Sequence, residues 1–325
     1  MAQAIEDALA ALELKSTLSG VIRVAGENRY ETGFKVADVY KETLGVEKFQ
    51  TALVATGKNF ADALPGSYLA YVKQAPILLT NEKEQYMDSV VAYITENVEA
   101  GADVYILGGT AVVPAEMDEK LTAAGYNPVR LAGENRYETN VKILEAAGVT
   151  GGEIIVATGT NFADSLSASA VGRPILLVKD QLNDLQKEYL TTLESSSFYI
   201  VGGEAAVGKE VEKELGAYGT VLDRLAGRNR RETSVLIAQN FFGDPPAAVT
   251  AYAGNFPDGL CGGPLAAELN VPLLIIVDGK TTEAADYMAA KNIELGYVLG
   301  GEKVLADKTV ETVFGLESTD EIIVK

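Results

Sequence analysis

The chain has 325 residues, 47 % of them hydrophobic and 22 % charged, which is typical of globular proteins and not of disordered ones. Its formal net charge of −19 argues against nucleic acid or an anionic membrane surface as a general partner, although a local basic pocket can coexist with it. It contains no histidine, which excludes Ser-His-Asp and Cys-His catalysis and removes the commonest zinc ligand.

The first segment predicts a short helix over Ala2–Leu18, because it is rich in Ala, Glu, Leu and Lys. We treat residues 1–20 as a helical lead-in. No signal peptide is recognisable at Met1, which fits either a cytoplasmic protein or a chain whose signal peptide has been removed. No apolar run reaches about 20 residues, the length of a membrane span, so we expect no membrane insertion.

Strand and helix signals alternate from Val21 onwards. The predicted strands of the first part are Val21–Ala25, Thr51–Thr56, Pro76–Thr80 and Asp103–Leu107. The predicted helices run over about Arg29–Leu44, Phe60–Lys73, Glu84–Ala100 and Pro114–Ala124. The strands are short and almost wholly apolar, as in a parallel sheet that is covered on both faces. Right-handed βαβ units and a three-layer α/β sandwich follow.

The same phrases recur three times along the chain. The first is R-V-A-G-E-N-R-Y-E-T at Arg23–Thr32, which returns as R-L-A-G-E-N-R-Y-E-T at Arg130–Thr139 and as R-L-A-G-R-N-R-R-E-T at Arg224–Thr233. Each is followed by an N-F-[AP]-D-x-L phrase, by a P-[IL]-L-[LI] run and by a double glycine. The period of about 100 residues is that of a small domain with its own core. We therefore predict three modules, at residues 21–128, 129–223 and 224–325.

The strand before the A-G-x-N-R turn occurs a fourth time, at Glu321–Lys325, where the arginine and the following helix are missing. We expect this last strand to be structural and to complete the third sheet. The shared strands then lie at the junctions between modules. Because no Pro/Gly/Ser-rich linker separates the modules, we expect them to pack tightly around a pseudo-threefold axis. Cys261, the single cysteine, is expected to be a buried small hydrophobe.

The repeated glycines and polar residues follow the strands, so they gather at the carboxyl-end edge of each sheet, where open α/β sheets bind ligands. Helix N-termini at this edge offer unpaired N–H groups, which suit anions. The repeated asparagines are expected to be helix N-caps, because each precedes an acid by three residues. They are also candidate ligand-binding residues, namely Asn28, Asn59, Asn135, Asn161, Asn229 and Asn255.

Three arginines, Arg29, Arg136 and Arg230, fall at about the first position of a helix, where a cation opposes the helix dipole by roughly 0.3–1 kcal/mol. Either a salt bridge or an anionic ligand has to offset this cost. We favour salt bridges to acids of the same edge or to the neighbouring module, and keep ligand binding as the alternative. The acids of the same edge are Asp62, Asp164 and Asp258.

Together these phrases resemble the type 2 cell-wall-binding repeat family of Gram-positive surface proteins, from Val21 to the C-terminus. The resemblance implies three tandem Toprim-like or flavodoxin-like α/β modules with mostly parallel sheets, closed into a triangular disc with pseudo-threefold symmetry. It also implies an extracellular protein that anchors an S-layer or other surface protein non-covalently to an anionic secondary cell-wall polymer. Other surface-layer proteins are further partners under this resemblance.

The resemblance associates the I-L-L run with polymer binding. In this chain the run comprises Ile77, Leu78, Leu79, Ile175, Leu176 and Leu177. By composition alone these are core-strand residues. The third copy departs from the pattern, with L-L-I at Leu273–Ile275 and A-Y-A-G at Ala251–Gly254, so we expect the third module to contribute least to binding.

Two other functions compete with wall anchoring. A Toprim-like enzyme needs a glutamate and an Asp-x-Asp pair to hold Mg²⁺, and the sequence contains no Asp-x-Asp. The Walker and G-x-G-x-x-G nucleotide motifs are absent too. We therefore predict a protein without catalytic residues, metal or cofactor. The remaining alternative is a surface assembly or adhesion protein that binds protein partners through the same edges.

Overall fold

The computed structural model describes residues 20–317 and 321–325. The helix predicted over Ala2–Leu18 lies outside the described residues. Within them, no helix is both long and apolar enough to cross a membrane.

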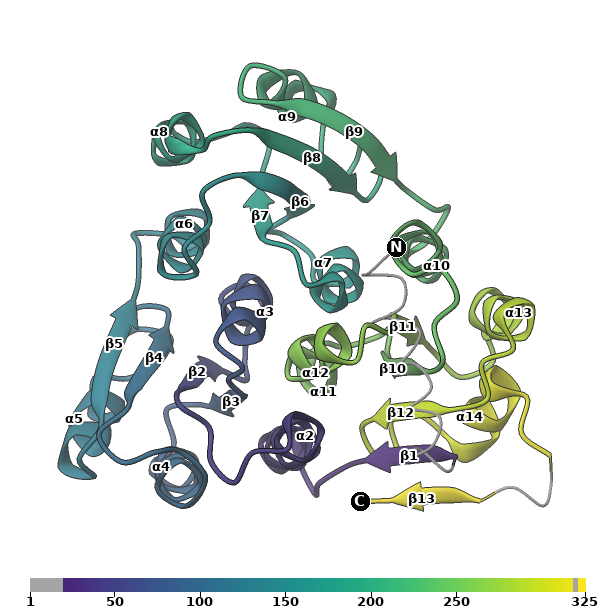
Figure 1. Cartoon of the computed structure of the whole chain (residues 1–325), viewed down its shortest axis with the longest axis horizontal. Coiled ribbons are helices and arrows are strands. Elements are labelled where there is room, and N and C mark those ends of the chain that lie inside the picture. Colours follow the sequence, from purple (N-terminus) through teal and green to yellow (C-terminus); the bar gives the residue numbers. More distant parts are fainter. Residues whose placement is uncertain (1–19, 318–320) are drawn as a thin grey trace.

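Three sheets stand at the corners of a triangular molecule, and neighbouring strands in each are parallel (Figure 1). The first sheet has the order β3 (Ile77–Thr80), β2 (Ala52–Thr56), β4 (Asp103–Leu107), β5 (Asn127–Leu131). The second has the order β7 (Ile175–Val178), β6 (Gly152–Thr158), β8 (Ser196–Val201), β9 (Thr220–Leu225). The third has the order β11 (Leu273–Ile276), β10 (Ala248–Tyr252), β12 (Gly296–Leu299), β1 (Val21–Val24), β13 (Ile322–Val324).

Helices cover both faces of each sheet (Figure 1). Those nearest the centre are α3 (Ala63–Val72), α7 (Ala163–Ala168) with the 3-10 turn η1 (Ser169–Val171), α11 (Pro257–Leu260) and α12 (Gly262–Glu268). Those between consecutive sheets are α2 (Arg29–Leu44), α6 (Arg136–Ala146) and α10 (Arg230–Phe241). Those on the outside are α4 (Glu84–Asn97), α5 (Glu116–Ala123), α8 (Asp184–Thr192), α9 (Lys209–Leu215), α13 (Thr282–Lys291) and α14 (Asp307–Phe314). The predicted α/β fold of three repeated modules is confirmed.

The first strand lies in a different sheet from the one expected. We predicted Val21–Ala25 as the opening strand of the first module, but β1 pairs with β12 and so completes the third sheet. The strand β5 likewise completes the first sheet, and β9 the second. The C-terminal strand β13 does join the third sheet, as predicted, on the outer side of β1. The two ends of the described chain therefore meet in one sheet, and the ring of modules is closed.

The repeated A-G-x-N-R turn carries the chain from one module to the next. After the turn that follows β1, helix α2 packs against β3 of the first sheet, and α6 and α10 pack in the same way against β7 and β11. The glycine of this turn is required by space, since a Cβ on Gly26 would lie 2.3 Å from the Cβ of Glu31. Each copy of the motif thus belongs to two modules at once.

The strand arginines join β1, β5 and β9, the strands that precede the A-G-x-N-R turns, to the loop after the neighbouring strand. Arg23 is only 3 % exposed and donates to the carbonyls of Gly300 (2.8 Å) and Leu305 (2.9 Å) and to Asp307 (2.7 Å). Arg130 and Arg224 make the equivalent bonds, to the first glycine of the double-glycine loop and to the start of the following helix. In the third sheet this clamp holds the N-terminal strand to the C-terminal module.

Replacing Arg23 with alanine is expected to lower the free energy of unfolding by about 2–4 kcal/mol, because two buried carbonyls lose a charged donor. Denaturant unfolding followed by circular dichroism measures the change. The control is Ile323→Ala in the outer strand β13, whose side chain is 42 % exposed and should cost less than about 1 kcal/mol. Equal losses from the two variants would contradict a closing role for Arg23.

Candidate ligand-binding site

The carboxyl ends of the two central strands of each sheet mark the candidate site. In the first sheet the chain runs from β2 to its neighbour β3 and then crosses to β4 on the other side of β2. Such a topological switch point leaves a crevice at the strand ends, where α/β proteins bind ligands. The N-F-[AP]-D phrase follows β2, and the double glycine Gly108–Gly109 follows β4. The second and third sheets repeat this order.

Helix α2 caps its own N-terminus. Asn28 accepts hydrogen bonds from the backbone N–H groups of Tyr30 and Glu31, and Glu31 accepts one from the N–H of Glu27. Thr32 accepts one from the N–H of Gly26. Asn135 and Asn229 cap α6 and α10 in the same way, so the predicted caps are confirmed at these helices. At α2, α6 and α10, two of the N–H groups that we expected to be unpaired are therefore already occupied by the asparagine.

The second set of asparagines does not cap helices. Asn59 accepts only from the N–H of Ala61, and helix α3 begins later, at Ala63, without a side-chain cap. Asn161 and Asn255 likewise bond only to nearby N–H groups of their own turn, and α7 and α11 also lack a side-chain cap. The predicted caps are wrong here, because these helices begin too late for the asparagine to be the N-cap, and the acid of the phrase faces the double-glycine loop.

The acid of the N-F-[AP]-D phrase is largely buried. Asp62 is 7 % exposed, and burial raises the pKa of its carboxyl to about 6, while the charge of Arg136 opposes the rise. Burial also raises the pKa of Asp164, against the charge of Arg230. In each case the arginine comes from the repeat that follows the acid. Asp258 completes the ring, since burial raises its pKa while a hydrogen bond with Thr32 and the charge of Arg29 lower it.

The first glycine of each pair makes room for this acid. A Cβ on Gly108 would lie 2.8 Å from Oδ2 of Asp62, and Gly108 adopts a φ of +103° that L side chains rarely take. Gly202 and Gly300 stand against Asp164 and Asp258 in the same way. The double glycine therefore accommodates a protein carboxylate, which leaves its first residue no free space for a phosphate.

The three arginines at the first helical position bind backbone carbonyls. The Nη1 atom of Arg29 donates to the carbonyl of Gly57 at 2.7 Å, and Arg136 and Arg230 donate to the equivalent carbonyls of Gly159 and Ala253. Among the described residues no ion pair joins these arginines to an acid. The salt bridges that we favoured are therefore wrong as direct contacts, although each arginine lies near enough to lower the pKa of the acid across the junction.

Three phenylalanines meet at the centre of the ring. The rings of Phe60, Phe162 and Phe256, one from each repeat, have centroids 5.7–6.1 Å apart. The guanidinium of Arg136 lies 5.7 Å from the centroid of Phe60, and that of Arg230 lies 5.2 Å from Phe162. Sequence analysis missed this cluster. The signal was the phenylalanine at the same place in every repeat, which must converge if equivalent residues surround one axis.

The I-L-L residues lie inside the protein. Their side chains on β3 and β7 are at most 1 % exposed: Ile77, Leu78, Leu79, Ile175, Leu176 and Leu177. The edge of β7 is covered by α6, where the amide of Asn140 donates to the carbonyl of Ile175 and accepts from the N–H of Leu177, both at 2.8 Å. These side chains cannot touch a polymer in this structure. They place the strand whose carboxyl end leads into the site.

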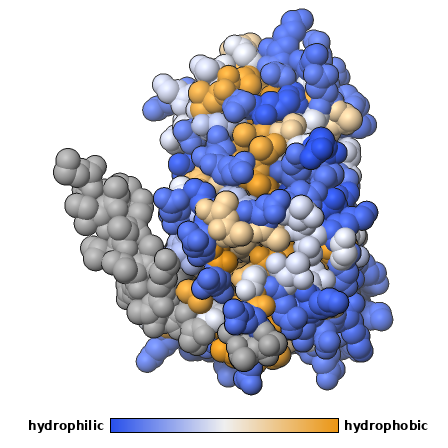
Figure 2. Space-filling model, turned by 90° about the vertical axis from the view of Figure 1, so that its right-hand side faces the viewer, coloured by the Kyte–Doolittle hydropathy of each residue, from blue (hydrophilic) through white to orange (hydrophobic). Residues whose placement is uncertain are grey.

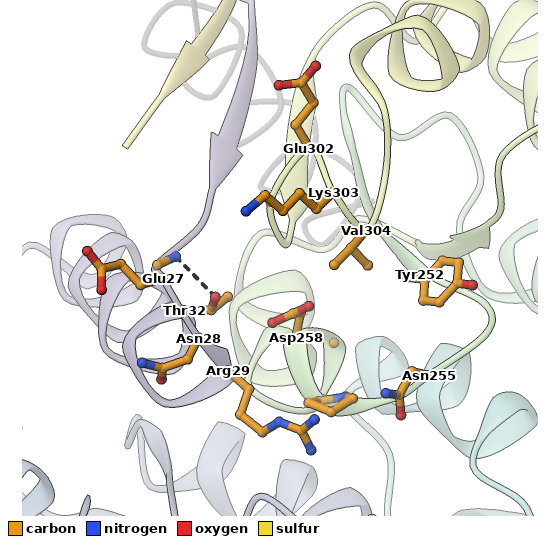
Figure 3. A pocket seen from close by; sticks show the side chains of 14 residues that line it. Glu27, Asn28, Arg29, Thr32, Tyr252, Asn255, Asp258, Glu302, Lys303 and Val304 are labelled. Atoms are coloured by element: carbon orange, nitrogen blue, oxygen red, sulfur yellow. Dashed lines mark hydrogen bonds between the residues drawn. The ribbon is translucent and has the colours of Figure 1, made fainter. Parts of the chain in front are cut away.

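A cleft of about 620 Å³ opens at the junction between the third sheet and α2 (Figure 3). Its walls come from three distant segments, namely residues 26–32, 252–259 and 301–304. Figure 3 shows Asp258 in the middle, with Lys303 on one side and Arg29 on the other. Among the described residues no group of three His, Cys, Asp or Glu could hold a metal ion. The lining of the cleft offers charged and amide side chains to a ligand.

Replacing Asp62 with asparagine tests its burial. A carboxyl whose folded pKa is about 6, against an ordinary 3.8, favours the folded state at low pH and disfavours it increasingly between pH 4 and 6. We expect the variant to gain up to about 3 kcal/mol over the wild type at pH 7 and almost nothing at pH 4. Denaturant unfolding at several pH values measures this, with the exposed Asp286→Asn as control. A pH-independent difference would contradict the raised pKa.

Comparison with known proteins follows the same repeats. The family model of cell wall binding domain 2 (CWB2) matches residues 23–118, 130–212 and 224–311. The N-acetylmuramoyl-L-alanine amidase LytC of Bacillus subtilis (strain 168) is 27 % identical over 297 residues, which are 89 % of this chain and 57 % of that protein. The amidase enhancer of the same strain is 28 % identical over 270 residues, which are 81 % of this chain and 36 % of that protein.

Solved structures with the same fold include two proteins from Clostridium difficile. Cwp8 is similar with a TM-score of 0.82 and 26 % identity, over 97 % of this chain and 56 % of that one. Cwp6 shares the fold with a TM-score of 0.76 at 24 % identity, over 93 % of this chain and 48 % of that one. The chain thus spans 36–57 % of the length of these four proteins. Because the family model matches most of its length, the chain belongs to the cell wall binding domain 2 family and is a cell-wall-binding protein of the cell surface.

Proposed function

We propose that the chain anchors a surface protein non-covalently by binding an anionic secondary cell-wall polymer at the junctions between its modules. The observation that carries this proposal is that, within the described part of the chain, Arg29, Arg136 and Arg230 have hydrogen-bond donors left unused. Each forms a hydrogen bond to one backbone carbonyl. An arginine has five N–H donors in a planar fork that matches phosphate or carboxylate oxygens, so donors remain for an anionic ligand.

The net charge of the chain makes local contacts decisive. At −19 the protein as a whole repels an anionic polymer, and Figure 2 shows a side of the molecule covered largely by hydrophilic residues, with hydrophobic patches between them. Binding therefore has to depend on arginines held at fixed places and not on the overall field. Salt is then expected to influence retention in two opposing ways, since it screens both the local attraction and the general repulsion.

The other predicted site residues have different parts in this proposal. The side chains of Asn161 and Asn255 are exposed at the same edge and are suited to hydrogen-bond sugar hydroxyls, and Asn59 occupies the equivalent place in the first repeat. Asn28, Asn135 and Asn229 hold the turn that presents each arginine. The buried I-L-L residues act through the position of their strand. We propose that they support binding without touching the polymer.

We further propose that this part of the protein binds and does not catalyse. LytC is named an amidase, and the chain covers 57 % of it. On our proposal, the activity in that name belongs to the part of LytC outside the shared repeats. The repeated edges could instead receive protein partners, such as other surface-layer proteins. Wall preparations with and without the secondary polymer separate these two functions.

Changing Arg136 to glutamine is expected to lower retention on native walls partly, because two equivalent junctions remain. The double variant of Arg29 and Arg136 is expected to lower retention far more than twofold, since linked sites raise avidity by about 10²–10⁴. Sedimentation with purified walls measures retention, and thermal melts confirm folding. The matched control is Arg173→Gln, an exposed arginine paired with Glu153.

Walls from which hydrofluoric acid has removed the secondary polymer complete this test. Loss of wild-type retention on them supports a polymer ligand. Retention that is unchanged on such walls favours protein partners. Unchanged retention of the double variant on native walls would contradict the role of the arginines. Complete loss of retention from the single variant of Arg136 would instead indicate one composite site at the phenylalanine cluster.

A further inference from the structure

We call the junction between the third sheet and α2 the third junction. Two differences distinguish it from the other two junctions, and both change the lining of its cleft. We propose that its cleft is a subsite for one sugar unit of the polymer that carries a phosphate or carboxylate group, with Tyr252 as the platform for the sugar ring. This inference rests on the proposed wall-polymer function and adds the chemistry of the unit and the place where it binds. It also reverses our expectation that the third module contributes least.

The first difference is a paired substitution at the end of the central strand. The first repeat has Thr56 and Lys58, and the second has Thr158 and Thr160; in both, the threonine side chain accepts the N–H of the residue two places on. The third repeat has Tyr252 and Gly254 at these places.

The ring of Tyr252 occupies the place that a side chain at residue 254 would take. A Cβ on Gly254 would lie 2.4 Å from the ring of Tyr252, so any other residue would collide with the ring in its present position. The ring lines the cleft and is partly exposed (Figure 3). Tyrosine combines an apolar face with a polar tip, which suits a ring that is apolar on its faces and polar at its edges. The third repeat thus has an aromatic ring in the wall of the cleft, where the first and second repeats have a turn closed by a threonine hydrogen bond.

The second difference is an added cation. Lys303 follows the double glycine, where the first and second repeats have Ala111 and Ala205. It lines the cleft opposite Arg29, and among the described residues it forms no ion pair (Figure 3). Two cations on opposite walls can bind one anionic group from two sides.

The acids of the cleft fit hydroxyl groups. Glu27, Glu302 and Asp258 are among the residues that line the cleft, and Asp258 lies in its middle, so a bare anion meets a carboxylate as well as two cations (Figure 3). Carboxylates accept hydrogen bonds from hydroxyls, and the amide of Asn255 can donate or accept. A molecule that carries several hydroxyls and one anionic group satisfies both sets. A sugar phosphate or a sugar acid has this chemistry, whereas inorganic phosphate has only half of it.

Titration of the full chain with four small probes tests the subsite. The probes are glucose 1-phosphate, glucuronate, glucose and inorganic phosphate, followed through backbone amide shifts in two-dimensional NMR spectra. We expect at least one of the two charged sugars to shift residues 252–258 and 301–304, and the equivalent residues 56–62 and 109–112 to respond at least tenfold more weakly. Glucose and inorganic phosphate are expected to bind at least tenfold more weakly than that charged sugar. The stronger of the two charged sugars identifies the anionic group as phosphate or carboxylate.

Variants that copy the other repeats provide matched controls. The double change Tyr252→Thr with Gly254→Thr installs the residues of the second repeat, and Lys303→Ala installs those of the first and second. Each is expected to weaken binding of the preferred charged sugar at least tenfold, whereas the exposed Lys308→Ala should change it less than twofold. Thermal melts check folding, and the wild-type titration decides if a variant does not fold.

Several results would overturn this subsite. They are the absence of any response to both charged sugars, equal responses at all three junctions, equal binding of inorganic phosphate and the charged sugars, and full binding by the variants. Wall retention separates such a failure from a failure of the proposed function. If the chain is retained on native walls but no probe binds at the third junction, the proposed function stands and only the subsite is refuted. A chain that is not retained at all loses both.

Discussion

The hydrogen bonds of the strand arginines are the interaction on which the rest of the structure depends. In each sheet a guanidinium from β1, β5 or β9 reaches the carbonyl of the first glycine in the double-glycine loop and the start of the helix that follows that loop. That strand is also the point where the chain leaves for the next module. The clamp therefore holds in place the strand from which the chain enters the next module. With three such clamps, including that of Arg23 between the N-terminal strand and the C-terminal module, the ring is closed.

Closure of the ring determines where charges and rings meet. Because each repeat motif spans two modules, the arginine of one repeat faces the acid of the repeat before it, as Arg136 does Asp62. The same geometry brings Phe60, Phe162 and Phe256 together at the centre. Neither arrangement exists within a single module. The candidate binding edges are thus properties of the junctions, and a module cut from the ring would lose half of each.

Much of the fold follows from local sequence. Helix α2 spans Arg29–Leu44 as predicted, because Asn28 caps its start and Gly45 ends it in the left-handed conformation. The apolar runs are buried strands, and Cys261 is buried too. Local sequence does not show the partner of β1, because a strand of this pattern fits beside any of three nearly identical neighbours. In the structure β1 takes the place beside β12 that β5 has beside β4 and β9 beside β8, and the fourth copy of the strand, β13, is added outside it.

The site was harder to predict than the fold. The asparagines of both phrases have the same spacing to an acid, but only those before α2, α6 and α10 cap helices. The acids of the other phrase point to glycines that come from a separate strand, such as Gly108 for Asp62. Spacing along the chain cannot reveal such a neighbour. The sequence analysis also missed the cleft beside Tyr252, because we interpreted the altered motifs of the third repeat as a loss of binding.

The position of β13 beside β1 has a mechanical consequence. The two strands are parallel, with Val21 opposite Ile322 and Arg23 opposite Val324. A pull that enters the chain before Gly20 and leaves it after Lys325 acts at opposite ends of this pair, along the strands. Such a load shears the hydrogen bonds between the strands together and does not open them one by one. Resistance to force is governed by the rate of unfolding and not by equilibrium stability. The hydrogen bonds between β1 and β13 therefore bear such a load before the three module cores do.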